Sequence, residues 1–539
     1  MTMRRLAILG LVVALSASAL WAGRYEQYTE AAAKSEDMKP AAATFFGGDG
    51  PEEFVAAGVL GDGRIVAFGN AWGPKFSSPK EPLVMGKGAH RGLKAVKTDR
   101  KGRKELPREN PDAAGMIVFY QPGLKAVEKV ARFDWGVASL STGAVSKDGK
   151  GLILTGRCTE AFKTVGRHAK VQRGVDEPEA QRRRRFGSYK YDGVEVSGDV
   201  FVMRIDVKTA KPEWVVLLKG HRQPGDEIHQ DAEGNVYVEI HGVKKISADG
   251  KTVTTIWGSG FGGKVGLRAV DPKTGTIYWG GDRNTNTGRE PWRQPYLYKI
   301  GPDGEKIWTA WAWDAKRVGS DKYRLVSDSA ARDGAIAPNG DVLVAGWSDG
   351  GNSVFTRQPY DLDKPAKNKG LGMSSWGMKN ANSLAYILRL DPKTREQKAW
   401  TLWLSYIPDD FSSPKHRNAP NFASIKDIRV LEDESIGIVG GAATGLIQTP
   451  HSFWTYPRDG GKFGGQFVTV LGPKLSRIRY STYLPGCKDL SMAATKKGLV
   501  VASRSDGGGG RMGKTPGSKN AAQPTFGGTF DGHLLLITE

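Results

Sequence analysis

The feature that most constrains the fold of this chain is a recurring segment that consists of a turn, apolar residues at alternating positions and, usually, a glycine. GDGRIVAFG and PNGDVLVAG are two examples, and each is typical of a tight turn that leads into a half-buried β-strand. The seven copies begin at Gly61, Lys147, Ala232, Pro272, Pro338, Glu432 and Lys496. The sequence therefore predicts one β unit that is repeated seven times.

A second hairpin follows six of these segments. YLYKIGPDGEKIWTAWAW from Tyr296 and AYILRLDPKTREQKAWTLWL from Ala385 each read as an apolar strand, a turn and an aromatic-rich strand. The repeated unit thus has four strands, and its shortest step, from Gly234 to Gly275, is about 40 residues, which is the period of a propeller blade. We therefore predict an all-β chain that forms a single seven-bladed β-propeller.

The two ends of the chain predict how the ring closes. The last unit ends in TFDGHLLLITE at Glu539, before an outermost strand is made, and the missing strand is found near the N-terminus. AAATFFGGDGPEEF from Ala41 resembles the join RYSTYLPGCKDL from Arg479, where one blade leads into the next. We expect the segment from Ala41 to Phe46 to pair in the blade that contains His533, which would cover two open sheet edges.

The N-terminal residues predict export. Arg4 and Arg5 precede an apolar run from Leu6 to about Leu15, and small residues then offer cleavage after Ala19 or Ala22. This order is that of a secretory signal peptide, and the run is too short to span a bilayer. We predict a signal peptide at 1–22, a linker at 23–40 and the propeller at 41–539, with a secreted, periplasmic or cell-envelope location and no transmembrane anchor.

One blade also suggests a family. The segment from Ile428, IRVLEDESIGIVGGAATGLIQTPHSFWTYPRDGGKFGGQFVTVLGPKLSRIRYSTYLPG, resembles the β-propeller repeat of secreted bacterial proteins, the SBBP repeat. The resemblance lies in the V-x-G-x-T run, the T-P before an aromatic residue and the Y-S-T-Y-L-x-G ending. It implies a propeller and an extracytoplasmic location, but it implies no common activity.

The formal net charge of +21 is unevenly distributed. Most of the excess lies in four predicted insertions, at about 72–114, 157–198, 348–382 and 504–530. Each follows a second strand and precedes a third, and propellers place these connections on one face. Such a basic face would attract polyanions in a salt-dependent manner. The alternative is that basic, Gly- and Pro-rich loops only keep the surface soluble.

Arginine and aromatic residues occur together in these loops and in the 283–293 region. Arginine makes bidentate hydrogen bonds to sulfate, carboxylate or phosphate, and an aromatic face can stack on a sugar ring. The candidate ligand-binding residues are Trp72, Arg100, Lys101, Arg103, Arg182, Arg183, Arg184, Arg185, Arg283, Trp292, Arg293 and Trp376. The predicted partner is an anionic polysaccharide or another polyanion. Because no nucleic-acid motif is present, nucleic acid is a weaker candidate, and a protein partner stays open.

Catalytic signals are weak. His221, Arg222 and His229 are the candidates for a lyase, which needs a proton acceptor and a cation beside the acidic sugar. Carboxylate pairs for glycoside cleavage could come from Glu52, Glu53, Asp328, Asp427 and Asp489. The competing interpretation is that all of these are ordinary strand and turn residues.

No motif for a metal or a cofactor is present, so we expect neither. The sequence leaves open whether Cys158 and Cys487 form a disulfide.

Three functional hypotheses remain. The first is a non-enzymatic exported propeller that binds anionic polymers, either acidic polysaccharide or an envelope polymer, through a basic face. The second is a polysaccharide lyase or hydrolase that acts on acidic glycans at the mouth of the central channel. The third is a scaffold for protein–protein interaction.

Overall fold

The structure is a computed structural model, and part of the chain is described by it. The described residues are 31–539 apart from 33, 49, 73–77, 79, 88–96, 99–103, 106–112, 160–161, 163–164, 166–169, 174–189, 192–193, 196–198, 219–226, 241, 259–265, 286–291, 321–327, 350–353, 372–383, 406–422, 444, 455–463, 509–513 and 528. The predicted signal peptide therefore lies outside the described residues.

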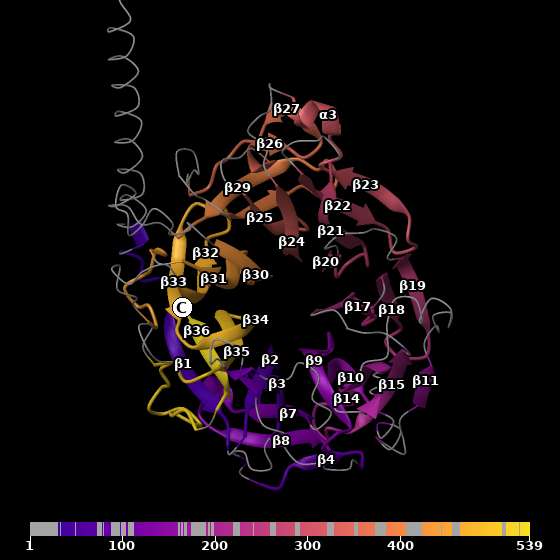
Figure 1. The fold of residues 1–539 in the computed structure, drawn as a ribbon, viewed down its shortest axis with the longest axis vertical. Helices are drawn as coiled ribbons and strands as arrows, with labels where there is room; N and C mark the ends of the chain where they lie inside the picture. Colours follow the sequence, from indigo (N-terminus) through magenta and orange to yellow (C-terminus); the bar gives the residue numbers. More distant parts are fainter. Residues whose placement is uncertain are drawn as a thin grey trace, which may run out of the picture.

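The described residues form seven antiparallel blades around a central axis (Figure 1). Blade 1 contains β2 (Glu52–Val59), β3 (Ile65–Ala71), β7 (Ala114–Tyr120) and β8 (Val127–Phe133), and blade 2 contains β9 (Ala138–Val145), β10 (Gly151–Cys158), β14 (Asp199–Asp206) and β15 (Pro212–Leu218). Blade 3 contains β16 (Ile228–Gln230), β17 (Val236–Glu239), β18 (Gly242–Ile246) and β19 (Val253–Gly258), and blade 4 contains β20 (Gly266–Val270), β21 (Ile277–Asn284), β22 (Arg293–Ile300) and β23 (Lys306–Ala310).

The remaining blades complete the ring. Blade 5 contains β24 (Ser329–Ile336), β25 (Val342–Ser348), β28 (Leu384–Leu390) and β29 (Gln397–Trp403), and blade 6 contains β30 (Ala423–Val430), β31 (Ile436–Ala442), β32 (Gly465–Leu471) and β33 (Ile478–Leu484). Blade 7 contains β34 (Cys487–Thr495), β35 (Gly498–Ser505), β36 (Asp531–Thr538) and β1 (Lys39–Phe46). The predicted all-β, seven-bladed propeller is confirmed.

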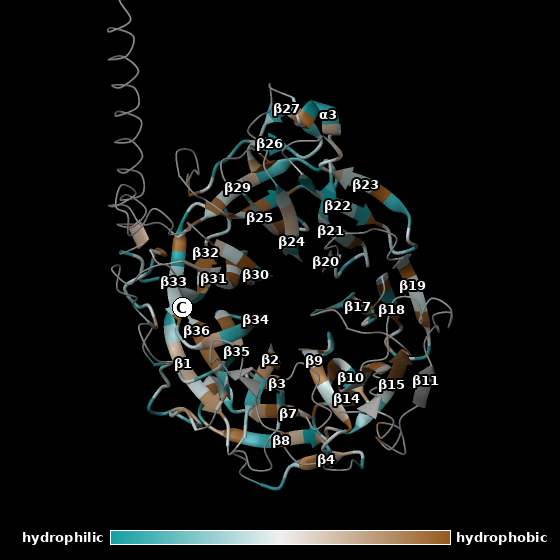
Figure 2. Ribbon diagram, viewed as in Figure 1, coloured by the Kyte–Doolittle hydropathy of each residue, from teal (hydrophilic) through white to brown (hydrophobic). Residues whose placement is uncertain are grey.

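Each of the seven repeated segments forms the turn into the second strand of a blade. In the first, Gly63 adopts a φ of 85° and the side chain of Asp62 accepts a hydrogen bond from the Arg64 amide at 3.1 Å. In the sixth, Glu434 occupies the left-handed region with a φ of 63°, although it is not a glycine. The apolar residues that follow are buried between neighbouring blades, and Figure 2 shows hydrophobic residues along the strands. This burial is the main favourable term for such a fold.

The N-terminal strand β1 lies at the outer edge of blade 7. It pairs antiparallel with β36, and Thr44 lies opposite Leu534 and Phe45 opposite His533. Phe45 and Phe46 are buried, and the ring centroids of Phe46 and Phe54 are 5.8 Å apart. The first strand of the described residues thus covers the edge of the last one.

The predicted insertions connect second strands to third strands, and two of them add a further strand to a blade. β4 (Leu83–Met85) pairs parallel with β8, and β11 (Lys170–Arg173) pairs parallel with β15. This differs from the expectation of loops alone. Smaller elements are the pairs β5 (Lys97–Thr98) with β6 (Lys104–Glu105), β12 (Lys190–Tyr191) with β13 (Val194–Glu195) and β26 (Arg357–Gln358) with β27 (Asp361–Pro365), and the helices η1 (Pro122–Leu124), α3 (Ala315–Val318) and η4 (Val354–Thr356).

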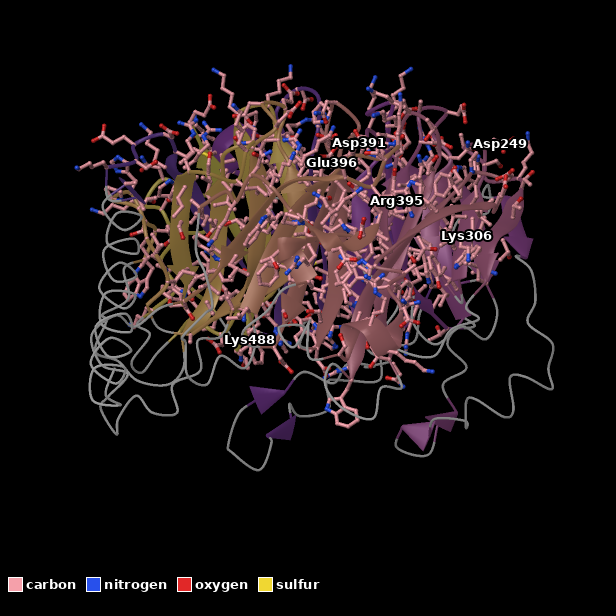
Figure 3. The ribbon with its side chains drawn as sticks, turned by 90° about the horizontal axis from the view of Figure 1, so that it is seen from above. Asp249, Lys306, Asp391, Arg395, Glu396 and Lys488 are labelled. Carbon is pink, nitrogen blue, oxygen red and sulfur yellow. The ribbon has the colours of Figure 1, made fainter. Side chains whose placement is uncertain are left out.

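The disc has two faces that are defined by where the strands begin and end. We call the side where first and third strands begin the linking face, and the opposite side the turn face. Lys488 near the start of β34 lies toward the linking face, whereas Asp249 and Asp391 lie on the turn face (Figure 3). Second strands end at the linking face because each blade is antiparallel.

In the described part of the chain, no helix has the length and apolarity needed to cross a membrane. Cys158 and Cys487 are buried in blades 2 and 7, and no disulfide joins them. Burial raises the pKa of the Cys487 thiol to about 12, so this thiol stays protonated and unreactive at neutral pH.

The packing of β1 predicts that it is part of the cooperative fold. Phe46→Ala removes a buried ring and should lower the free energy of unfolding by about 3–5 kcal/mol. Lys39→Ala at the exposed start of the same strand should change it by less than about 0.5 kcal/mol. Urea unfolding followed by tryptophan fluorescence measures both, and equal midpoints for the two variants would contradict the role of β1.

Candidate functional site

An ionic cluster lies near the axis and joins blades 3, 5 and 6. The guanidinium of Arg429 is 3.0 Å from a carboxylate oxygen of Glu227 and 3.0 Å from one of Asp427. His229 Nε2 is 3.0 Å from the other Glu227 oxygen. Asp333 completes the cluster, because one oxygen from each of the three carboxylates lies within 4.8 Å of the others. Blade 3 is thereby connected to blades that are distant from it in sequence.

Bulges in the innermost strands place two of these carboxylates. Asp333 follows a register shift in β24, and Asp427 follows an equivalent shift in β30. The Asp333 carboxylate accepts a hydrogen bond from the Ile428 amide at 2.8 Å, and the Asp427 carboxylate accepts one from the Met492 amide at 2.8 Å. Each aspartate therefore binds the innermost strand of the next blade, and a buried amide near a bulge obtains an acceptor.

Burial and charge act on the acids of this cluster in different directions. Burial, together with the negative charges of Glu227 and Asp427, raises the pKa of Asp333 well above its usual value. Burial also raises the pKa of Asp427. Burial acts to raise the pKa of Glu227 as well, but Arg429 and His229 outweigh it and lower this pKa to about 2. Glu227 is thus the carboxylate that most readily carries the charge opposite Arg429, whereas the surroundings of Asp333 oppose its ionisation.

The same three carboxylates have the spacing that oxygen ligands of a hard cation require. However, the Arg429 guanidinium already lies between Glu227 and Asp427 and supplies the positive charge that the carboxylates need. The donor set is therefore a poor fit for a resident metal ion.

A second group of residues lies toward the linking face between blades 4 and 5. One oxygen of Asp328 accepts hydrogen bonds from the amides of Trp292 and Arg293 at 2.7 and 2.8 Å. The other oxygen is 2.9 Å from Arg293 Nε. Asp328 is buried, whereas the side chain of Trp292 remains 54% exposed. A buried carboxylate thus fixes the backbone that presents an exposed indole ring.

Arginines surround a second tryptophan in this group. The guanidinium of Arg293 lies 5.1 Å from the Trp347 ring centroid, and that of Arg332 lies 5.5 Å from it. Arg268 Nη1 donates to the backbone oxygen of Arg332 at 2.5 Å. We call Arg268, Arg293, Arg332, Trp292 and Trp347 the arginine–tryptophan cluster, and its cation–π geometry is of the kind that stabilises stacked guanidinium groups.

The predicted ligand-binding residues have different outcomes. Trp292 and Arg293 lie together as described above, which keeps them candidates. Trp72 is only 5% exposed and packs with Ala113 and Phe530, so the expectation of an exposed stacking ring is corrected there. Arg283 Nη2 donates to the backbone oxygen of Trp311 at 3.0 Å and so has a structural contact. Arg100, Lys101, Arg103, Arg182, Arg183, Arg184, Arg185 and Trp376 lie outside the described residues.

Among the predicted catalytic residues, His229 is placed in the ionic cluster, while His221 and Arg222 lie outside the described residues. Asp427 is the one proposed carboxylate that the described structure brings into the ionic cluster, where it meets Glu227 and Asp333. Glu53 and Asp489 both contact the guanidinium of Arg504, at 3.8 and 3.0 Å. Glu53 also accepts from Asn70, and Glu52 accepts from the Gly48 amide. Their contacts are those of structural residues rather than of an opposed catalytic pair.

Comparison with known proteins gives no family. No protein-family model matches the chain, and no curated protein is significantly similar to it. Among solved structures, a protein of unknown function from Dyadobacter fermentans is 10% identical with a TM-score of 0.36, and the match covers 93% of this chain and 100% of that one. An ulvan lyase of polysaccharide lyase family 25, bound to -[GlcA(1-4)Rha3S]-, is 9% identical with a TM-score of 0.37 and coverages of 86% and 92%.

The endosialidase of phage phi92 is 9% identical with a TM-score of 0.33, and the match covers 93% of this chain and 69% of that one. Of these neighbours, the ulvan lyase is described as a polysaccharide lyase. At TM-scores of this size the likeness carries no argument about what this chain does.

The ionic cluster predicts a pH-dependent stability term. A carboxyl group whose pKa is raised on folding stabilises the fold fully below its unfolded pKa of 3.8, and this contribution is lost as the pH rises through the folded pKa. Asp333→Asn removes the ionisation, so its unfolding free energy should fall less between pH 4 and pH 9 than that of the unmodified protein. Urea unfolding at several pH values measures this, and parallel pH profiles would contradict it.

The same cluster predicts a large cost for losing its cation. Arg429→Met leaves Glu227 and Asp427 without their partner and should cost about 3–5 kcal/mol of stability. Arg64→Met, at a partly exposed ion pair with Asp62, should cost about 0–1 kcal/mol. A cost for Arg429→Met as small as that for Arg64→Met would show that the cluster does not hold the blades together.

Proposed function

We propose that this chain is an exported, non-enzymatic propeller that binds anionic polymers, either acidic polysaccharide or an envelope polymer, on its linking face. The observation that carries the proposal is the exposed Trp292, whose backbone is fixed by the buried Asp328 and whose neighbour Arg293 contributes a guanidinium. Tryptophan is enriched at binding sites because its ring presents a large face with one polar N–H group, and an arginine beside it favours an acidic ligand.

The net charge of +21 supports the same proposal. A strongly positive protein attracts polyanions from a distance, and this attraction falls as salt is added. Export and membership of the secreted β-propeller repeat family remain part of the proposal, because they rest on the N-terminal sequence and on the blade from Ile428.

A second candidate function is a lyase that acts on acidic glycans, and the observation that favours it is the convergence of His229, Glu227 and Arg429 near the axis. A lyase needs a base to remove a proton and a cation to neutralise the sugar carboxylate. Here, however, Arg429 already pairs with two carboxylates, and Nε2 of His229 already contacts Glu227. Since these groups are occupied by one another, the binding function is better supported.

The first test is a titration of residues 23–539 with heparin, polygalacturonate and neutral dextran at about 50 and 200 mM salt. We expect the two polyanions to bind, more weakly at the higher salt, and dextran not to bind. Equal binding of dextran, or no binding of either polyanion, would contradict the proposal. Incubation with polygalacturonate should leave the absorbance at about 235 nm unchanged, because a rise would report the double bond that a lyase creates.

Trp292 provides a sharper test of the binding surface. Trp292→Ala should weaken heparin binding by about 2 kcal/mol, the usual cost of truncating a central aromatic residue. Ile307→Ala is the matched control, because Ile307 is 52% exposed but lies near the turn face, at the start of β23. Loss of affinity in both variants, or in neither, would contradict a binding surface at Trp292.

A further inference from the structure

The three arginines of the arginine–tryptophan cluster differ in how their charges are balanced. Arg293 pairs with Asp328 through its Nε at 2.9 Å. Arg268 donates to the backbone oxygens of Gly280 at 3.0 Å and of Arg332 at 2.5 Å, so its contacts are with neutral groups. The guanidinium of Arg332 stacks on Trp347, and none of the described carboxylates lies within ion-pair distance of it. Asp328 is thus the one described carboxylate that forms an ion pair with these arginines, while Asp282 acts on Arg293 and Arg332, and Asp349 on Arg293, from beyond ion-pair distance.

Arg332 is also partly buried, so water screens its charge incompletely. It lies in the bulge of β24, next to Asp333, and it is only partly exposed. Burial lowers the pKa of Arg332, and Asp282 offsets this only in part, while Arg268 and Arg293 add to the repulsion. An arginine does not lose its proton under such conditions, so the unbalanced charge favours an anion from outside the chain.

The stacking geometry leaves hydrogen-bond donors unused. A guanidinium that lies over a ring keeps its N–H groups at its edge, where they can hold two oxygens of one oxyanion. The Nε1 of Trp347 is a further buried donor, and it has no acceptor among the described residues. Donors and charge of this kind bind a sulfate or a carboxylate more strongly than a neutral hydroxyl group, because the hydrogen bonds are then charge-assisted on both sides.

We infer that Arg332, with Arg293 and Trp347, forms a subsite for the sulfate or carboxylate group of an acidic sugar. The sugar ring, or its neighbour in the polymer, stacks on Trp292. This inference rests on the proposed function, and it adds the chemical class of the ligand group and the residue that recognises it. The subsite lies between blades 4 and 5, and Asp328 acts as a positioning residue for Trp292 and Arg293 rather than as a ligand.

The test measures binding of dextran sulfate, carboxymethyl dextran and neutral dextran, which share one backbone, to residues 23–539 by titration calorimetry. Arg332→Gln should weaken binding of the acidic polymer at least tenfold, as expected for the loss of a charge-assisted hydrogen bond. Arg395→Gln removes the same charge from the turn between β28 and β29 and should weaken binding less than twofold (Figure 3). Urea midpoints verify that both variants are folded.

Arg332→Lys separates geometry from charge, because lysine keeps the charge but lacks the planar pair of donors. It should restore less than half of the lost binding free energy. Stronger binding of dextran sulfate than of carboxymethyl dextran identifies sulfate as the ligand group, and the reverse order identifies carboxylate.

Two unfavourable outcomes can be distinguished. If the unmodified protein binds an acidic dextran but Arg332→Gln binds it equally well, the subsite is wrong and the proposed function stands. If the unmodified protein binds neither acidic dextran nor heparin, the proposed function fails and the subsite fails with it. If Arg332→Gln does not fold, Arg332→Lys is the variant that decides, because it keeps the charge, and binding of acidic dextran as tight as that of the unmodified protein would overturn the subsite.

Discussion

The structure depends on polar contacts in which a side chain of one blade binds the innermost strand of the next, and four of the seven blade junctions have such a contact among the described residues. A propeller has no covalent bond between its blades other than the chain that links them, and its innermost strands converge where little room is left for apolar side chains. These strands carry bulges, so some of their amides need acceptors from outside their own sheet. Asn70 accepts a hydrogen bond from the Leu140 amide, and Glu239 accepts one from the Leu267 amide. Asp333 accepts from the Ile428 amide, and Asp427 accepts from the Met492 amide. Together with β1 on the edge of blade 7, they hold the ring in one register.

This constraint explains why the most heavily charged group near the axis is not the best candidate for chemistry. Asp333 and Asp427 each accept a hydrogen bond from an amide of the neighbouring innermost strand, and the charges of Arg429 and Glu227 balance one another. Replacing these groups would affect stability first. The arginine–tryptophan cluster differs, because Trp292 is exposed and Arg332 forms no ion pair with a described carboxylate. The proposed binding function is therefore better placed on the linking face than near the axis.

Much of the fold could be predicted from the sequence because its signals are local. A turn such as that of Gly61–Gly63 and the alternating residues after it lie within ten positions, and β1 could be matched to blade 7 by its likeness to the join before Cys487. The ionic cluster could not be predicted in this way, since Glu227, Asp333 and Arg429 come from three blades and share no spacing.

The candidate ligand site shows the same limit. Trp292 and Arg293 are adjacent in sequence, so their combination of charge and aromatic ring could be recognised from the sequence. Arg332 could not be recognised from the sequence, because it lies within a strand rather than in a basic loop. Its position over Trp347 appears only when the blades are packed together. Trp72 was misjudged for the opposite reason: it lies next to a basic insertion, but Phe530 from the far end of the chain covers it.

The most direct test of the binding face is amide hydrogen–deuterium exchange with and without heparin. Binding at the linking face should slow exchange at the amides of Trp292 and Arg293 and leave the turn from Asp391 to Glu396 unchanged, whereas protection of that turn alone would contradict binding there.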